Sequence, residues 1–294
     1  MAAVPPAAAR FRPISQPTAQ PTAQPTAPTG GQTGARPILS LGPLVEGVLL
    51  RRYKRFLADV ELRQTGPGGE AAGTVVTVHC ANTGPMTGVL HPGGRVRLRH
   101  APSPSRKLAW TWEQAEVPGA AGEPVWVGIN TALPNGLVRA TIEAGCLEPW
   151  LGPIGEIRAE VPYGENRRSR IDLLLTPAAG AADPRPIYVE VKNTTWSRGD
   201  LALFPDTVTE RGQKHLLELS ALPPVARAVL VPCLSRADVR RFAPGDSADP
   251  RYGELFRSAR AAGVEVLPCI YAFGAEGVCW QGLASVEDRD PAGG

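Results

Sequence analysis

The sequence predicts an α/β (α+β) fold in two domains, a small N-terminal β-barrel followed by a mixed sheet that helices flank. Two observations lead to this prediction. Short apolar runs separated by Gly- and Pro-rich turns fill residues 41–120, whereas residues 121–282 alternate such runs with helical patterns. The chain has 294 residues, of which 43% are hydrophobic, so both domains can form a core.

The two ends of the chain are expected to lie outside these domains. The first 40 residues are rich in Pro, Ala, Thr and Gln, and the segment from Gln16 to Gly30 repeats Pro-Thr-Ala-Gln. Because this composition holds few large apolar side chains, burial cannot offset the entropy lost on ordering. We therefore expect a disordered tail over residues 1–40 and a frayed end over residues 283–294.

The first domain is expected to contain five strands. Turn signals separate them, notably Gly66-Pro67-Gly68-Gly69 and His91-Pro92-Gly93-Gly94. The expected strands are Leu44–Arg52, Leu57–Leu62, Thr74–Cys80, Arg95–His100 and Leu108–Val117. Five short strands in so few residues favour an OB-like barrel, a fold that binds oligonucleotides along one face, although an SH3-like barrel would give the same pattern.

The second domain is expected to alternate strands and helices around a mixed sheet. Its expected strands are Val125–Ile129, Glu156–Tyr163, Arg170–Leu175, Ile187–Lys192, Ala226–Val231 and Val264–Ile270. Its expected helices are Thr131–Ala144, Asp206–Leu219, Arg236–Arg241 and Pro250–Ala262. Gly145 follows the first helix and is expected to end it.

Two of these strands carry charged side chains in a pattern that suits metal-assisted hydrolysis. Strand side chains alternate between faces, so Glu190 and Lys192 point one way and Val191 the other. If the strands are neighbours, Asp172 reaches the same patch, where two carboxylates can hold Mg²⁺ and the lysine can activate a water. Such a site suits attack on a phosphodiester. The alternative is structural, with Asp172 paired to Lys192 or Arg170.

The helix expected after the Glu-x-Lys strand carries further polar candidates. Glu210, Gln213 and Lys214 share one face, and Gln213 is a candidate catalytic residue that positions a phosphate or a water. A solvent-exposed polar stripe would show the same spacing. For His215 we expect a surface or packing role, with a general base as the alternative.

Positive charge is concentrated in the first folded third. The whole chain has a net charge of only +3, but residues 44–107 hold ten basic and four acidic side chains, which favours a polyanion such as DNA, with RNA as an alternative. The candidate nucleic-acid-binding residues are Arg51, Arg52, Lys54, Arg55, Arg95, Arg97 and Arg99. The last three alternate along one strand and are expected to form a basic stripe. A solvated basic face without a partner is the alternative.

Aromatic residues lie close to these basic ones. Tyr53 can stack on a base, whereas Phe56 is expected in the core. Trp110 and Trp112 alternate on a strand and are expected to pack inside the core or between the domains.

Composition also limits where the chain works. Its five cysteines are scattered and form no Cys-x-x-Cys pair, which argues against a zinc ribbon or a redox motif and fits a reducing compartment. There is no apolar run of membrane-spanning length and no secretory signal pattern. We expect a cytoplasmic protein without a membrane partner; the sequence does not indicate its oligomeric state.

Seven longer runs point to a known family. They are Leu44–Gly47, Arg52–Val60, Asn82–Met86, Gly128–Asn135, Ser169–Asp172, Tyr188–Asn193 and Phe204–Leu216. Together they resemble the sugar fermentation stimulation protein A (SfsA) family of prokaryotes, over roughly residues 44 to 275. The resemblance implies an OB-like domain followed by a PD-(D/E)XK nuclease-like domain.

By the same resemblance, Asp172 and Glu190 would be the metal ligands, for Mg²⁺ or alternatively Mn²⁺, and Lys192 the catalytic lysine. The implied activity is that of a DNA/RNA nuclease. The alternative is a catalytically silent DNA-binding regulator of sugar (maltose-type) catabolism genes.

The chain departs from the family pattern at two positions. Ala140 stands where the family usually carries a helix Glu, and Glu143, one turn on, is the expected substitute. Pro85 stands where the family usually has Ser, which removes a hydroxyl from a turn. The first departure puts full nuclease activity in question.

Overall fold

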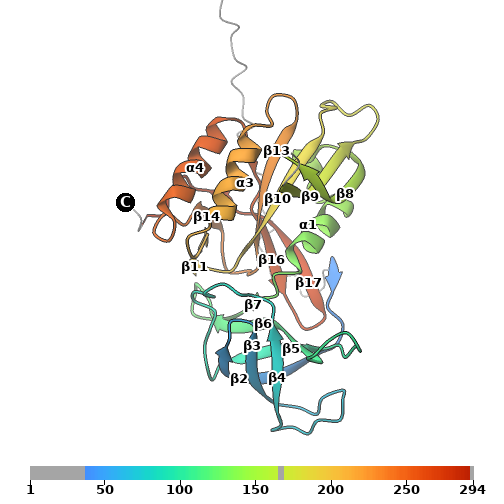
Figure 1. Cartoon of the computed structure of the whole chain (residues 1–294), viewed down its shortest axis with the longest axis vertical. Helices are drawn as coiled ribbons and strands as arrows, with labels where there is room; N and C mark the ends of the chain where they lie inside the picture. Colours follow the sequence, from blue (N-terminus) through green and yellow to red (C-terminus); the bar gives the residue numbers. More distant parts are fainter. Residues whose placement is uncertain (1–36, 165–168, 292–294) are drawn as a thin grey trace, which may run out of the picture. The chain divides into compact units, whose positions relative to one another are not determined.

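The structure is a computed structural model that describes residues 37–164 and 169–291 (Figure 1). Most of the expected N-terminal tail therefore lies outside the described residues. Of its last four residues, Leu39–Ser40 forms strand β1, which pairs antiparallel with β17 (Gly277–Leu283). The prediction of a disordered tail is thus wrong for Leu39 and Ser40, because backbone hydrogen bonds to β17 order these two residues.

Five strands close into the expected N-terminal barrel. They are β2 (Leu44–Tyr53), β3 (Leu57–Leu62), β4 (Val75–Cys80), β5 (Arg95–His100) and β6 (Trp110–Pro118). Their order is β4-β3-β2-β5-β6, and a parallel pairing of β4 with β6 joins the two ends. This is the OB topology, and the strand predictions are confirmed to within two residues at each end.

The barrel core is formed by side chains that alternate inward. Trp112 is fully buried and Trp110 is 3% exposed, so the expected core role of both is confirmed. Strand β7 (Pro124–Gly128) pairs with β6 and extends the barrel sheet. The first domain therefore runs past the expected boundary at residue 120.

The second domain is built on an eight-stranded mixed sheet. Its order is β1-β17-β16-β13-β10-β9-β8, with β15 paired to β13. The strands are β8 (Ile154–Tyr163), β9 (Ser169–Pro177), β10 (Ile187–Thr194), β13 (Arg227–Leu234), β15 (Glu265–Val266) and β16 (Cys269–Phe273). Strand β10 pairs antiparallel with β9 and parallel with β13, so it lies in the middle of the sheet.

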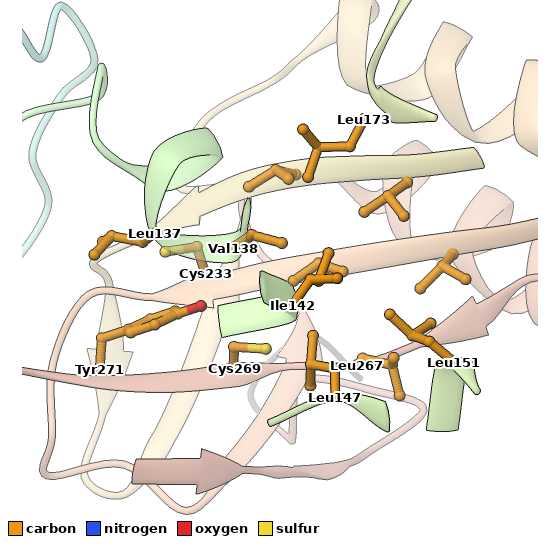
Figure 2. Packing of buried hydrophobic residues seen from close by; sticks show 14 of the residues in the cluster. Leu137, Val138, Ile142, Leu147, Leu151, Leu173, Cys233, Leu267, Cys269 and Tyr271 are labelled. Atoms are coloured by element: carbon orange, nitrogen blue, oxygen red, sulfur yellow. The ribbon is translucent and has the colours of Figure 1, made fainter. Parts of the chain in front are cut away.

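Helices cover both faces of this sheet. They are α1 (Pro134–Glu143), α2 (Glu148–Leu151), α3 (Glu210–Ser220) and α4 (Pro250–Ala261). Helix α1 packs on one face, where Leu137, Val138 and Ile142 meet an apolar layer that includes Leu173 and Cys233 (Figure 2). Helices α3 and α4 pack on the other face (Figure 1). Because side chains alternate between the two faces along β10, each one packs either toward α1 or toward α3 and α4.

The helix ends follow from local capping. Thr209 accepts a hydrogen bond from Gly212 N (3.1 Å), so α3 begins at Glu210 rather than at the expected Asp206. Asp249 caps α4 in the same way, accepting from Tyr252 N at 3.0 Å. Gly145 has φ +75° and ends the first helix, as expected.

A second, small sheet was not predicted. It consists of β11 (Ser197–Arg198), β12 (Leu201–Phe204), β14 (Arg241–Pro244) and β18 (Ser285–Val286). The helix expected at Arg236–Arg241 is wrong: the buried Arg236 instead pairs with Asp238 at 2.7 Å, two residues on. The expected frayed end is also wrong for its described part, because β18 pairs with β14 and Asp290 pairs with Arg198 at 2.8 Å.

Two further features concern membrane-spanning helices and the cysteines. Among the described residues, no helix has both the length and the apolar character needed to span a membrane. Cys80, Cys233 and Cys269 are buried and form no disulfide. They act as small apolar core residues, as expected from their scattered positions.

Candidate active site

The central strand β10 presents its charged residues to the face that α3 covers. Val189 and Val191 pack in the apolar layer beneath α1, so Glu190 and Lys192 point the other way. Helix α3 places His215 against both of them. The prediction that Glu190 and Lys192 share a face is confirmed.

The neighbouring strand brings the second carboxylate to the same region. The register of β9 with β10 ends at the pair Val189↔Leu173. Beyond it, Asp172 accepts a hydrogen bond from Val191 N through Oδ2 (2.7 Å) and one from Asn135 Nδ2 through Oδ1 (2.8 Å). The side chain thus takes the place of a backbone acceptor where the two strands diverge. The expected adjacency of the two strands is confirmed.

Glu190 is the most buried member of the cluster, with 2% of its surface exposed. Its Oε1 accepts hydrogen bonds from Lys192 Nζ (2.5 Å) and from His215 Nδ1, and Lys192 Nζ lies 3.1 Å from the same ring nitrogen. Its Oε2 is also buried but has no hydrogen-bond partner in the described structure. An unpaired carboxylate oxygen in a protein interior is costly and marks a place where a further group can bind.

The electrostatics of the two carboxylates differ. Burial raises the pKa of Asp172, and repulsion from Glu190 raises it further. Burial also acts to raise the pKa of Glu190, but hydrogen bonding to His215 and the charge of Lys192 hold that pKa below its ordinary value. The two acids therefore interact across a weakly screened space, an arrangement that a cation would stabilise.

The donor set fits a hard divalent cation. The carboxylates of Asp172 and Glu190, the second with its Oε2 unpaired, are of the ligand type that Mg²⁺ and Ca²⁺ prefer. Within residues 37–164 and 169–291, no group of three or more His, Cys, Asp or Glu side chains is arranged to hold a metal. Asp172 and Glu190 alone fall short of such a group, so a cation held by them would need further ligands from the backbone, water or substrate.

A hollow beside α3 borders the cluster at a single residue, His215. Its lining residues are Glu160, Ser169, Arg170, Glu210, Arg211, Lys214 and His215. His215 is 6% exposed, and Arg211 donates to its Nε2 at 3.5 Å. Lys214 donates to Ser169 Oγ at 2.9 Å. The hollow therefore leads from a mainly basic rim to the side chain that contacts Glu190.

The sequence did not indicate the part that two residues play in the site. His215 was expected at the surface or in packing, and Asn135 was not singled out. His215 lies on the buried side of α3 with Leu216 and Leu219, and that apolar pattern was the signal that places it toward the sheet. Asn135 is in the first turn of α1, within one of the runs shared with the family.

Two other candidates lie elsewhere. Gln213 Nε2 donates to both carboxylate oxygens of Asp249, each at 3.0 Å, so its amide joins α3 to the start of α4. The expectation that it positions a phosphate is not supported by this contact. Glu143 is exposed and pairs with Arg139 at 2.8 Å, so it does not replace the carboxylate that Ala140 lacks.

The expected basic stripe on β5 is neutralised by acids from neighbouring strands. Arg95 pairs with Glu46 at 2.7 Å and with Glu116 at 2.8 Å. The two other arginines are paired in the same way, Arg97 with Glu46 at 3.1 Å and Arg99 with the buried Glu113 at 2.8 Å. The three arginines therefore lie on one face of β5, as predicted, but each is paired with an acid.

The run around residue 54 divides into paired and unpaired residues. Arg51 pairs with Asp59 at 2.8 Å, and Arg52 donates to backbone carbonyls, including that of Arg55. Lys54 and Arg55 are exposed at the β2–β3 turn. Phe56 is 47% exposed, so its expected place in the core is wrong.

Comparison with known proteins assigns the chain to a family. Residues 50–129 match the family description "SfsA N-terminal OB domain", and residues 132–277 match "Sugar fermentation stimulation protein RE domain". The chain belongs to the SfsA family. The suspected resemblance is thus confirmed over both domains, and it covers Asp172, Glu190 and Lys192.

The relatives of this SfsA-family protein match its sequence along most of its length. A "Sugar fermentation stimulation protein homolog" from Synechococcus sp. (strain WH7803) is 70% identical over 87% of this chain and 97% of its own. A homolog from Parasynechococcus marenigrum (strain WH8102) is 72% identical over 84% and 94%. The solved structure of Pyrococcus furiosus SfsA in complex with Ca²⁺ is similar with a TM-score of 0.71 and 26% identity, covering 86% of this chain and 100% of that one.

Proposed function

We propose that this SfsA-family protein is a metal-dependent nuclease that hydrolyses phosphodiester bonds in DNA, with RNA as an alternative substrate. The observation that carries the proposal is the buried Glu190, whose Oε2 is unpaired and whose neighbour Asp172 has a raised pKa because of burial and repulsion between the two acids. The Ca²⁺ complex of the related Pyrococcus furiosus protein supports a cation at a site of this family.

Asp172 and Glu190 would hold the cation, with Mg²⁺ as the first candidate and Mn²⁺ as the second. When bound, such an ion polarises a phosphoryl oxygen and lowers the pKa of a coordinated water. Asn135 and Val191 N hold the Asp172 carboxylate in a fixed orientation through one hydrogen bond to each oxygen. Ligands held in this way need little rearrangement on loading.

Lys192 supplies a positive charge next to the carboxylates. Its Nζ lies 2.5 Å from Glu190 Oε1, and 13% of its side chain is exposed. In this weakly screened position the ammonium can stabilise negative charge on an attacking water or on the phosphate. Arg211 and Lys214 at the rim of the hollow attract the phosphodiester backbone toward it.

A cleavage assay on the full chain tests the proposal. Purified protein is incubated with single- and double-stranded DNA and RNA, in Mg²⁺, in Mn²⁺ and in EDTA. We expect cleavage only with the metals, and its loss in Glu190→Gln and in Asp172→Asn. Glu143→Gln is the matched control, because this carboxylate of the same domain pairs with Arg139 at the surface. Equal cleavage by wild type and Glu190→Gln would exclude this site as the source of the activity.

A catalytically silent DNA-binding regulator of sugar-catabolism genes is the second candidate. It is favoured by Ala140, which leaves α1 without the carboxylate usual in the family, since Glu143 does not replace it. It is also favoured by the pairing of Glu190 with Lys192 and His215. This function predicts salt-sensitive DNA binding that persists in EDTA and in Lys192→Ala.

A further inference from the structure

Strand β8 forms one edge of the eight-stranded sheet (Figure 1). It has ten residues and pairs with β9 along one side, and no strand within residues 37–164 and 169–291 pairs with its other side. The opposite edge of the sheet is formed by β1, which has only two residues. An edge strand has unpaired N–H and C=O groups, so a long one can pair with a strand of another chain.

The two ends of β8 are unsuited to such pairing, but its middle is regular. A bulge interrupts the register with β9 between Ile154 and Glu156. At the other end, Glu160 has a left-handed φ of 54°, and Pro162 has no N–H to donate. Bulges and prolines commonly protect sheet edges. Here they leave residues 156–159 between them in unbroken register with β9.

The two faces of this stretch differ in character. Ile157 is half-buried and packs against the apolar layer beneath α1. Glu156 and Arg158 project from the other face, with 61% and 53% of their side chains exposed. They lie 3.8 Å apart, and an ion pair this exposed contributes little to stability. The edge therefore presents an apolar side chain on one face and one charge of each sign on the other.

A groove of about 430 Å³ lies beside β8 on the α1 face. Its apolar lining comes from Ile142 of α1, Leu147, Leu151 of α2, and Ile154 and Ile157 of β8. A strand added to this edge would place its own apolar side chains over this groove. The groove therefore gives an arriving strand an apolar surface on which to pack.

Residues 155–159 complement a second copy of themselves. In two copies related by a twofold axis at Ile157, the strands run antiparallel, and residues equally far from Ile157 face each other. Glu156 of each copy then faces the partner's Arg158, so the charge pair forms twice. On the α1 face, Ile157 meets the partner's Ile157, and Gly155 faces the partner's Ala159. Every cross-strand pair is thus either oppositely charged or apolar.

The neighbouring registers do not fit. An axis at Glu156 or at Arg158 places that charge opposite its own copy, and like charges directly opposite are destabilising. An axis at Gly155 or at Ala159 draws the bulge or the left-handed Glu160 into the ladder. An axis between two residues would set side chains of opposite faces against each other. Charge and backbone geometry therefore select the axis at Ile157.

We propose that the protein forms a symmetric dimer in which β8 pairs antiparallel with β8 of a second copy, with the twofold axis at Ile157. The contact joins the two mixed sheets into one continuous sheet. A contact made by one short pair of strands buries little surface, so the dimer forms reversibly and its population rises with protein concentration. This inference does not depend on the proposed nuclease.

Sedimentation velocity of the full chain over a concentration series tests the dimer. We expect a reversible monomer–dimer equilibrium. Arg158→Glu sets two negative charges opposite each other at both symmetric contacts and should weaken association roughly tenfold or more. The double variant Glu156→Arg with Arg158→Glu exchanges the charges of each pair and should restore it. Arg251→Glu is the matched control, since it reverses an exposed charge that pairs with Glu254 on α4.

Hydrogen exchange at low and high protein concentration gives a second measurement. The amides of residues 155–159 should exchange more slowly at high concentration. A chain that stays monomeric at every concentration overturns the inference. So does a dimer that Arg158→Glu leaves intact, a double variant that fails to associate, or slowed exchange confined to another surface. Circular dichroism of each variant confirms that the fold is retained.

Discussion

The barrel and the mixed sheet both bury carboxylates in strands, but the two regions treat them differently. In the barrel, burial would raise the pKa of Glu46, yet Arg95 and Arg97 hold that pKa below its ordinary value, and Glu113 is bound by Arg99 and Asn130. In the sheet, Glu190 keeps an unpaired oxygen and raises the pKa of Asp172, which burial has already raised.

The difference shows that a charged pattern in a strand does not by itself indicate function. Arg-x-Arg-x-Arg on β5 and Glu-x-Lys on β10 look equally promising in sequence. Cross-strand neighbours complete the first pattern, since every arginine finds an acid. In the second, Glu190 pairs with Lys192, but it still repels Asp172 and raises its pKa, and perturbed acids of this kind are typical of sites that bind ions or substrates.

The largest expected effect concerns catalysis. Lys192→Ala should lower metal-dependent cleavage by about a hundred- to a thousandfold, because it removes a charge aimed at the reacting phosphate. Arg95→Ala, which removes a charge already paired with Glu46 and Glu116, should leave the rate nearly unchanged. Single-turnover rates with saturating enzyme measure both. Similar losses in the two variants would remove the distinction between the regions.

The free energy of unfolding should depend more on the buried barrel carboxylate Glu113 than on an exposed ion pair of the second domain. Glu113→Ala should lower the free energy of unfolding by about 3 kcal/mol, because it leaves Asn130 and Arg99 without their buried partner. Glu113→Gln keeps an acceptor and should cost less. Arg139→Ala breaks an exposed pair and should cost only about 0.5 kcal/mol. Urea denaturation of the three variants measures this, and an Arg139→Ala loss as large as that of Glu113→Ala would contradict it.

Metal binding should stabilise the sheet site only when both acids are present. At a Ca²⁺ concentration about a hundred times the dissociation constant, the wild type should gain about 2.7 kcal/mol against unfolding. Asp172→Asn and Glu190→Gln should gain much less, whereas Glu46→Gln in the barrel should respond as the wild type does. Thermal melting with and without Ca²⁺ tests this independently of cleavage.

The pH dependence of stability should also separate the two regions. Because the folded pKa of Asp172 is raised by burial and by Glu190, its stabilising contribution is present below the unfolded pKa, near 3.9, and is lost as the pH rises through the folded pKa. In EDTA, Asp172→Asn should therefore gain stability relative to wild type above about pH 4. For Glu46, whose folded pKa is lowered, the wild type should gain over Glu46→Gln as the pH rises. Urea titrations over a pH series give both signs.

The smallest expected effect concerns salt. Lys54→Ala should lower the slope of log affinity for single strands against log salt by about 0.7, the value for one lost phosphate contact. Arg95→Ala should leave that slope unchanged, since its guanidinium is held by two carboxylates. Anisotropy titrations at several salt concentrations measure the slopes. An equal fall in both variants would mean that β5 also contacts phosphate.

Local patterns in the sequence were enough for much of the fold. The period of two predicted β3 and β5 with their observed bounds, and it placed Glu190 and Lys192 on one face. Strands of two to four residues, such as β11 and β14, are too short to show a period, so the small sheet was missed. The prediction of a helix at residues 236–241 was wrong, because an ion pair between Arg236 and Asp238 shapes that segment.

By itself, the sequence determined the two-domain architecture, the family and the pair Glu190 and Lys192, because these depend on residues close together in the chain. Only the tertiary structure decided which charges remain unpaired. The acids that neutralise β5 lie 14 to 51 residues from their arginines, and His215 lies 25 residues from Glu190. Strand pairing and helix packing choose these partners, and no local pattern records that choice.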